Sequence, residues 1–250
     1  MNIILGLTPR CGTTSLAKSI RKSCKRHVVI EPFNSTQHNT DRPYAVYKGC
    51  DQIRSLESSL SMMCDDGYHC IKHLCYQLSS EENKSLLKIA ESTILLYRKY
   101  FVDTMISRYM SASFNNLTKL GWLGRKIDCD DRRYAEYVAN KKIYDSLERF
   151  PLLIDNISRK YIVAKQAFTS LTQDLQDNNI MLMEYDYLYN TEEVYNIFPS
   201  IVDFLGYKLH NDEWRGIMSP HNKFNSHDIY KRVIPNYEEL MNCRDEFIIE

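Results

Sequence analysis

Long hydrophobic runs are missing from this sequence. No apolar stretch approaches the roughly 20 residues that a membrane-spanning helix needs, so the sequence predicts no membrane span. Residues 1–6 contain a short apolar run without a basic leader, which is typical of a first β-strand and not of a signal peptide. The eight cysteines include no CxxC spacing. Without a secretory signal we expect them to be reduced thiols, and we expect the chain in the cytoplasm.

The sequence also has no excess of charge of either sign. Its 32 lysine and arginine residues balance 32 aspartate and glutamate residues, so the net charge is zero at neutral pH. A neutral chain lacks the broad positive surface with which proteins bind nucleic acid or anionic membranes. No nucleic-acid partner is therefore expected, and any anion-binding site has to be local.

What the sequence does contain is the pattern of one α/β domain over residues 1–250. Its 250 residues, 44% of them hydrophobic, suffice for a large core, and no repeat or linker divides them. Short apolar runs alternate with helical periodicity, which predicts a parallel central sheet flanked by helices. The predicted strands are residues 2–7, 27–30, 68–76, 93–97 and 180–185; the predicted helices are residues 14–24, 81–90, 101–113, 131–176 with a break at Pro151, and 192–205; residues 31–49 are predicted as a loop.

Residues 8–15, between the first strand and the first helix, have the composition of a phosphate-binding loop. A strand that leads directly into a helix brings backbone N–H groups and the positive end of the helix dipole to one place. A glycine in the loop permits close approach of the backbone, and an arginine with several hydroxyls suits a phosphate or phosphosulfate group. The residues that form the predicted site are Arg10, Cys11, Gly12, Thr13, Thr14 and Ser15.

This loop is not a Walker A motif, because that motif carries a lysine directly after its second glycine. Thr13 occupies the lysine position, and the basic residue, Arg10, precedes Gly12. Cys11 lies among these groups, so we expect an anion site to lower the pKa of its thiol. The alternative interpretation is an ordinary strand–turn–helix connection in which a threonine caps the helix.

The segment Arg10-Cys11-Gly12-Thr13-Thr14 resembles the 5′-phosphosulfate loop of the sulfotransferases that use 3′-phosphoadenosine 5′-phosphosulfate (PAPS), which commonly reads [KR]-[SA]-G-[ST]-[ST]. The resemblance implies that Arg10 contacts the phosphosulfate and that residues 12–15 hold the 5′-phosphate. It also implies a P-loop NTPase-like α/β fold. Further similarity occurs at residues 183–188, 201–206, 223–225 and 234–240, and it is weakest at residues 35–63 and 114–165.

The same family has a second signature, a strand ending in arginine and then a helix with a serine eight residues later, both of which contact the 3′-phosphate. In this sequence Arg98 and Lys99 follow the strand predicted at residues 93–97, and Ser107 comes eight residues after Lys99. A lysine at the arginine position keeps the charge but loses the planar fork. Arg98 and Lys99 are therefore both candidates.

Glu31 follows the second predicted strand, in the sequence Ile30-Glu31-Pro32-Phe33. Carbohydrate-type sulfotransferases carry Glu-Pro at this point, and the resemblance implies that Glu31 is the general base for the acceptor. A carboxylate beside the phosphosulfate can take the acceptor proton as the acceptor oxygen attacks sulfur. We expect Pro32 to hold Glu31 in an extended conformation. The alternative is a solvated loop carboxylate.

Several cysteines and histidines cluster between positions 64 and 75 but fit no standard zinc spacing. If residues 68–76 form a strand, Cys70 and Lys72 face one side, while His69, His73 and Cys75 face the other. We therefore predict no metal cofactor.

Together these patterns predict a sulfotransferase that moves a sulfuryl group from PAPS, its co-substrate, to a hydroxyl or amine of a small-molecule or glycan acceptor. Arg10 and Glu31 are the predicted catalytic residues, and Ser107 with Arg98 or Lys99 would select PAPS over ATP. One alternative is a P-loop kinase or nucleotidase that lacks the Walker lysine but has Asp186 as a magnesium ligand. The other is a non-catalytic nucleotide-binding module. The sequence selects neither an acceptor nor an oligomeric state.

Overall fold

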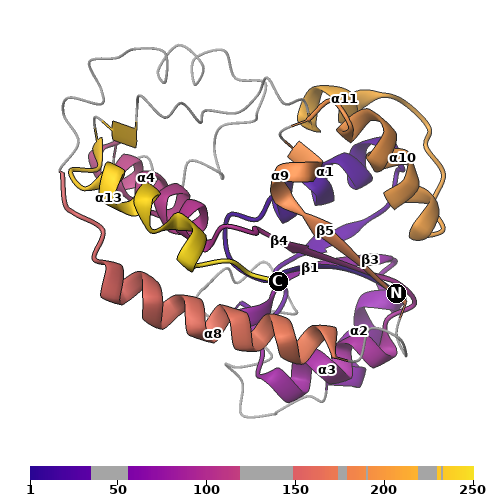
Figure 1. Ribbon diagram of the computed structural model, residues 1–250. Helices are drawn as coiled ribbons and strands as arrows, with labels where there is room; N and C mark the ends of the chain where they lie inside the picture. Colours follow the sequence, from indigo (N-terminus) through magenta and orange to yellow (C-terminus); the bar gives the residue numbers. More distant parts are fainter. Residues whose placement is uncertain (35–55, 119–148, 174–178, 190, 219–229, 232) are drawn as a thin grey trace. The chain divides into compact units, whose positions relative to one another are not determined.

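The structure, a computed structural model, describes residues 1–34, 56–118, 149–173, 179–189, 191–218, 230–231 and 233–250, without the side chains of residues 111–118. It is an α/β structure with a central sheet of five parallel strands and flanking helices (Figure 1). The strands are β1 (Asn2–Gly6), β2 (Val28–Ile30), β3 (Cys70–Leu74), β4 (Thr93–Tyr97) and β5 (Ile180–Glu184). The helices are α1 (Thr13–Ser23), α2 (Leu56–Asp65), α3 (Ser80–Ile89), α4 (Phe101–Thr118), α8 (Ile154–Thr172), α9 (Tyr185–Tyr189), α10 (Val194–Phe204), α11 (Glu213–Met218) and α13 (Tyr237–Asn242), with 3₁₀ turns η2 (Cys75–Gln77) and η4 (Arg244–Glu246).

The prediction of a parallel sheet flanked by helices is confirmed, and all five predicted strands are present. The strand predicted over residues 68–76 is shorter, since the chain turns into η2 after β3. Helix α2 was not predicted. Of the helix predicted over residues 131–176, the described part is α8, which begins after Pro151 as the predicted break requires. Residues 119–148 and 174–178 lie outside the described residues, as does most of the predicted loop, residues 35–49.

The order of the strands indicates where in the sheet a ligand site is expected. The order is β2-β3-β1-β4-β5, and each neighbouring pair is parallel. The connection after β1 leads to β2 on one side of the sheet, whereas the connection after β4 leads to β5 on the other. In open α/β sheets, ligands bind outside the carboxyl ends of adjacent strands whose connections diverge in this way. The carboxyl ends of β1 and β4 are therefore the expected place for a site.

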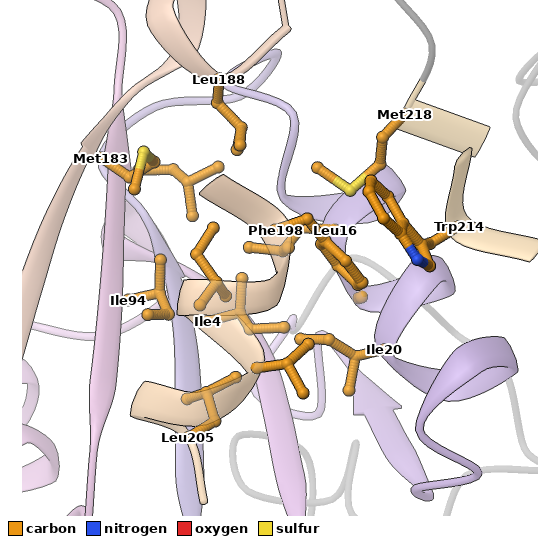
Figure 2. Close-up of a cluster of buried hydrophobic side chains, with 14 of the residues drawn as sticks. Ile4, Leu16, Ile20, Ile94, Met183, Leu188, Phe198, Leu205, Trp214 and Met218 are labelled. Atoms are coloured by element: carbon orange, nitrogen blue, oxygen red, sulfur yellow. The ribbon is translucent and has the colours of Figure 1, made fainter. Parts of the chain in front are cut away.

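One face of the sheet is covered by α1, α10 and α11, and α2 and α3 lie on the other (Figure 1). Leu16 and Ile20, four positions apart on α1, are buried with Ile4 of β1 (Figure 2). Phe198 of α10 stacks on Trp214 of α11 with their ring centroids 4.6 Å apart. Burying a large apolar side chain contributes roughly 1.5–3 kcal/mol. This cluster therefore holds α1, and with it the preceding loop, firmly on the sheet.

The described residues form two compact units. The first, which contains the sheet, comprises Met1–Lys99, Ala164–Asn222 and Glu250, and the second comprises Tyr100–Val163 and Lys223–Ile249. That residues 1–250 form one sulfotransferase domain stays a prediction. Within the described parts of the chain, no helix is both long enough and apolar enough to cross a membrane.

The second unit has its own polar contacts. The guanidinium of Arg244 binds both carboxylate oxygens of Asp103, at 3.1 and 2.6 Å, and lies 3.6 Å from the ring centroid of Tyr100. The side-chain amide of Asn236 exchanges two hydrogen bonds with the backbone of Leu152, at 3.0 and 2.9 Å. These contacts tie the end of the chain to the start of α4 and to the segment before α8.

Candidate functional site

The predicted phosphate loop lies at the carboxyl end of β1. The residue before the loop, Leu7, donates its backbone N–H to the carbonyl oxygen of Leu96 on β4 at 2.9 Å. Arg10 and Gly12 both have left-handed backbones, with φ of 71° and 84°. This conformation suits glycine but is uncommon for other residues, and strained residues of this kind concentrate at functional sites. The loop is therefore a tight turn fastened to two neighbouring strands.

The start of α1 differs from the alternative interpretation, in which a threonine caps the helix. Gly12, and not a threonine, is the N-cap residue, and no side chain caps the helix. Thr13 is buried, whereas Arg10 and Thr14 are exposed and Ser15 is half-buried. The first turn of α1 carries no acidic residue. A helix N-terminus with neighbouring hydroxyls and an exposed guanidinium attracts anions.

Cys11 behaves differently from the prediction. Its side chain is fully buried and points back toward the sheet, because a Cβ added to Gly6 would lie 2.7 Å from its sulfur. Burial raises the pKa of the Cys11 thiol, and this outweighs the lowering effects of Lys72, of the Thr8 and Thr13 N–H groups, and of Arg98. The expectation of a lowered pKa is wrong, since it assumed that the thiol faces the anion site.

Glu31 forms a buried ion pair that the sequence did not predict. Its carboxylate Oε1 contacts the ammonium group of Lys72 on β3, the strand next to β2. Only 1% of the Lys72 side chain and 12% of the Glu31 side chain are exposed. The interpretation of Glu31 as a solvated loop carboxylate is therefore wrong. Lys72 also acts electrostatically on Cys11, so its charge is felt both by Glu31 and by the loop after β1.

The backbone of Glu31 is left-handed, with φ of 51°, and not extended as Pro32 led us to expect. Contacts on both sides of the residue hold this conformation. The N–H of Glu31 donates to the carbonyl oxygen of Lys72 at 2.7 Å, and its own carbonyl accepts from the N–H of Asn34 at 3.2 Å. Tertiary contacts thus outweigh the local preference of a residue before proline.

The second carboxylate oxygen of Glu31 is also hydrogen-bonded. Oε2 accepts from the side-chain amides of Asn34 and Gln77, each at 2.9 Å. Burial alone would raise the pKa of Glu31, but the charge of Lys72 and these hydrogen bonds outweigh burial and lower it. Glu31 is therefore ionised at neutral pH. A proton taken up by Glu31 would remove its negative charge and so weaken the ion pair with Lys72.

His73 extends the same network. Its Nδ1 lies 3.0 Å from Gln77 Oε1, and its Nε2 lies 3.1 Å from Asn83 Oδ1. Burial lowers the pKa of His73 to about 4, against the two hydrogen bonds, which favour the protonated ring. His73 is thus neutral at physiological pH and helps to orient Gln77 toward Glu31. His38, the other histidine considered as a base, lies outside the described residues.

Folding stability is expected to fall by about 3 kcal/mol through His73 between pH values of about 7 and about 4. The unfolded histidine binds a proton below its ordinary pKa of 6.5, whereas the folded one does so only near 4. The unfolded state therefore binds more protons in this window, and stability is lost as the pH falls. Urea unfolding at several pH values measures it. His73→Gln should reduce the dependence of the free energy of unfolding on pH, whereas His69→Gln, at an exposed position, should not. Equal pH dependence in the two variants would show that His73 is not the responsible group.

Arg98 and Lys99 act in different places. Arg98 is buried, its guanidinium carbon lies 3.8 Å from the ring centroid of Tyr185, and its charge acts on Cys11 in the loop. Lys99 instead acts on Glu184 at the end of β5. Both residues follow the last residue of β4, Tyr97. Of the two candidates, Arg98 is the one on the side of the phosphate loop.

Ser107 lies on α4 in the second unit and is half-buried. Its pairing with Lys99 at the 3′-phosphate stays a prediction from spacing. Among the residues that the structure describes, no group of three or more His, Cys, Asp and Glu side chains could hold a metal. The metal-free reaction also stays a prediction.

Sequence reasoning missed Lys72, Gln77 and the tyrosines of α9. Lys72 had a detectable signal, because it is a charged residue in the middle of a predicted strand, and such residues are buried only when paired. Tyr185 lies in a segment that resembles the family, residues 183–188, but that resemblance did not indicate its contact with Arg98. Gln77 and Tyr189 had no signal, since their contacts join residues far apart in the sequence.

No protein-family model matches this chain, and no characterised protein has a similar sequence. The loop motif and the charges around the loop are thus what bear on its function.

Proposed function

We propose that this chain is a PAPS-dependent sulfotransferase with a P-loop-like fold, which transfers a sulfuryl group to a hydroxyl or amine of a small-molecule or glycan acceptor. The arrangement of cations around the loop carries the proposal. Arg10 is in the loop itself, Lys72 is on β3 and Arg98 follows β4, the two strands that flank β1. Lys72 and Arg98 both act electrostatically on Cys11 within the loop.

The positive groups and hydrogen-bond donors around the loop support PAPS as the ligand. PAPS carries a 5′-phosphosulfate and a 3′-phosphate, so it needs several positive groups and hydrogen-bond donors in one place. The N-terminus of α1, the hydroxyls of Thr14 and Ser15, and the Arg10 guanidinium would hold the 5′ end. Arg98 would approach the 3′-phosphate, with the part of Ser107 resting on the sequence alone.

In the proposed reaction the acceptor oxygen or nitrogen attacks sulfur, and the bond from sulfur to the bridging oxygen of the 5′-phosphate breaks. The acceptor proton goes to Glu31, and 3′-phosphoadenosine 5′-phosphate leaves. Arg10 offsets the negative charge that grows on the leaving phosphate. Because protonation neutralises Glu31, the charge of Lys72 is then released toward the same phosphate.

The nucleotide 3′-phosphoadenosine 5′-phosphate is expected to stabilise the protein more than ADP does. A ligand at about 100 times its dissociation constant adds roughly 2.7 kcal/mol of stability, and thermal-shift titrations with both nucleotides measure the difference. Arg98→Ala should reduce the preference for 3′-phosphoadenosine 5′-phosphate over ADP, expressed as the ratio of the two affinities, by about tenfold, as expected when a charged hydrogen bond is lost. Lys99→Ala should reduce this ratio less.

Arg26→Ala is the matched control, because Arg26 also stacks on a tyrosine ring, Tyr207, at 5.3 Å. It should leave the gap between the two nucleotides unchanged. Equal stabilisation of the wild-type protein by both nucleotides would refute the 3′-phosphate assignment.

One observation favours a non-catalytic nucleotide-binding module as the second candidate. Oε1 of Glu31 is paired with Lys72, and Oε2 accepts two hydrogen bonds. The pKa of Glu31 is lowered, so Glu31 is a weak base in this state. Such a module would bind 3′-phosphoadenosine 5′-phosphate but transfer no label from radiolabelled PAPS to a mixed pool of metabolites and glycans. Transfer of label to any acceptor would exclude it.

A further inference from the structure

The phosphate loop is covered on one side by a tyrosine of α9. The phenol of Tyr189 donates a hydrogen bond of 2.7 Å to the carbonyl oxygen of Gly12, which also accepts from the N–H of Leu16 at 3.2 Å. Burial raises the pKa of Tyr189 well above its usual value, so the phenol keeps its proton and acts as a donor. This bond joins residues 177 positions apart.

The ring of Tyr189 also explains why position 12 is glycine. A Cβ added to Gly12 would collide with the Tyr189 ring and would lie 3.0 Å from the Tyr185 ring. The close approach that we expected a ligand to make at Gly12 is therefore made, on the Cβ side, by α9. The two rings of α9 thus pack against the Cβ side of Gly12.

The contacts continue from the loop to Arg98. Tyr185 and Tyr189 are one helical turn apart, and their ring centroids are 4.9 Å apart. The guanidinium carbon of Arg98 lies 3.8 Å from the centroid of Tyr185. One continuous set of contacts thus links Gly12 after β1, Arg98 after β4 and the tyrosines after β5, which are neighbouring strands.

A long arginine side chain loses rotamer freedom when it binds a ligand, and binding is tighter if that freedom is already restricted. A ring face stacked against a guanidinium provides such a restriction and adds a cation–π attraction. The Tyr189 hydrogen bond acts similarly on Gly12, whose left-handed conformation sets the direction of the first N–H groups of α1.

We infer that Tyr185 and Tyr189 are positioning residues of the anion site: they hold the first turn of α1 and the Arg98 guanidinium in fixed relative positions before a ligand binds. The choice of a nucleoside 3′,5′-bisphosphate as the ligand rests on the proposed function. The positioning itself does not, because it is a property of the ligand-free protein.

Tyr189→Phe is the deciding variant, since it keeps the ring and removes only the hydrogen bond. Tyr207→Phe is its matched control, because the Tyr207 phenol also donates to a backbone carbonyl, that of His69, at 2.9 Å and at the amino end of β3. Each substitution should lower Tm by about 2–4 °C. Tyr189→Phe alone should speed hydrogen exchange of the amides of residues 13–16 by about fivefold or more and raise the Kd for 3′-phosphoadenosine 5′-phosphate by about five- to tenfold.

Tyr185→Leu and Tyr185→Phe test the second half of the inference. The phenylalanine keeps a ring face for Arg98, whereas the leucine does not, so only Tyr185→Leu should weaken binding by about fivefold.

The outcomes separate this inference from the proposed function. If the wild-type protein does not bind the bisphosphate, the proposed function is wrong, and hydrogen exchange in Tyr189→Phe still decides whether the tyrosine positions the loop. Unchanged exchange at residues 13–16 in that variant overturns the inference, whatever binds. Equal effects of Tyr189→Phe and Tyr207→Phe on Kd would mean that α9 contributes packing alone.

Discussion

Lys72→Met is expected to lower the free energy of unfolding by about 3–5 kcal/mol, because it removes one partner of a buried ion pair and leaves the Glu31 carboxylate without its cation. The Lys72 side chain is 1% exposed and that of Glu31 is 12% exposed, so water cannot readily replace the lost partner. Urea unfolding followed by circular dichroism measures the change. Lys88→Met, at an exposed position on α3, should change stability by at most about 0.5 kcal/mol.

The double variant Lys72→Met/Glu31→Leu makes this prediction specific. Replacing a whole buried ion pair by apolar residues is often close to neutral, because the cost of burying both charges disappears with them. The double variant should therefore be more stable than Lys72→Met alone, with an interaction energy of about 1–3 kcal/mol in the mutant cycle. Additive losses would show that the two charges do not depend on each other.

Glu31→Gln is expected to reduce sulfuryl transfer by at least about a hundredfold, since removal of a general base costs about 10²–10⁴ in rate. Its affinity for 3′-phosphoadenosine 5′-phosphate should stay within a few-fold of wild type, because the proposed role of Glu31 concerns the acceptor proton and not the phosphates of the donor. Single-turnover transfer from radiolabelled PAPS, with an acceptor found by screening, measures the first effect. Thermal-shift titration measures the second.

The ion pair makes a stability control necessary for this experiment. Glu31→Gln leaves the Lys72 ammonium buried without a carboxylate, so the variant is expected to unfold more easily, and transfer has to be measured well below its Tm. Glu91→Gln is the matched control, because Glu91 accepts from the Met1 amine in an exposed ion pair of 2.6 Å. Turnover close to wild type in Glu31→Gln would remove Glu31 as the base. His73 would then be the described histidine to test, although its pKa of about 4 makes it a weak base.

The expected loss of stability in Lys72→Met and the expected loss of transfer in Glu31→Gln both depend on the Glu31–Lys72 ion pair. A carboxylate that is buried beside a lysine stays charged, which is what a proton acceptor requires, but the same pairing lowers its basicity. The proposed reaction resolves this conflict only if an anionic donor near the phosphate loop draws Lys72 away from Glu31. A pH profile of transfer that shifts to higher pH on saturation with PAPS would support this coupling.

Local sequence patterns were sufficient to predict the five strands of the sheet and the break before α8. The apolar runs at residues 2–7 and 93–97 predicted β1 and β4, and Pro151 predicted the start of α8 to within a few residues. These signals depend on side-chain periodicity and on the backbone limits of proline, both of which act over a few residues. Helix α2 was missed, because no helix was predicted over residues 56–65.

The sequence by itself determined that Arg10 and Gly12 lie in a turn between a strand and a helix and that Glu31 follows the next strand; that this turn binds phosphate stays a prediction. Only the tertiary structure decided how these groups are held. It buried Cys11, paired Glu31 with Lys72 from 41 positions away, separated Arg98 from Lys99 and set Tyr189 on Gly12. The physical reason is that burial and pairing depend on which strands and helices become neighbours in the sheet, and the pattern of any one segment does not contain that order.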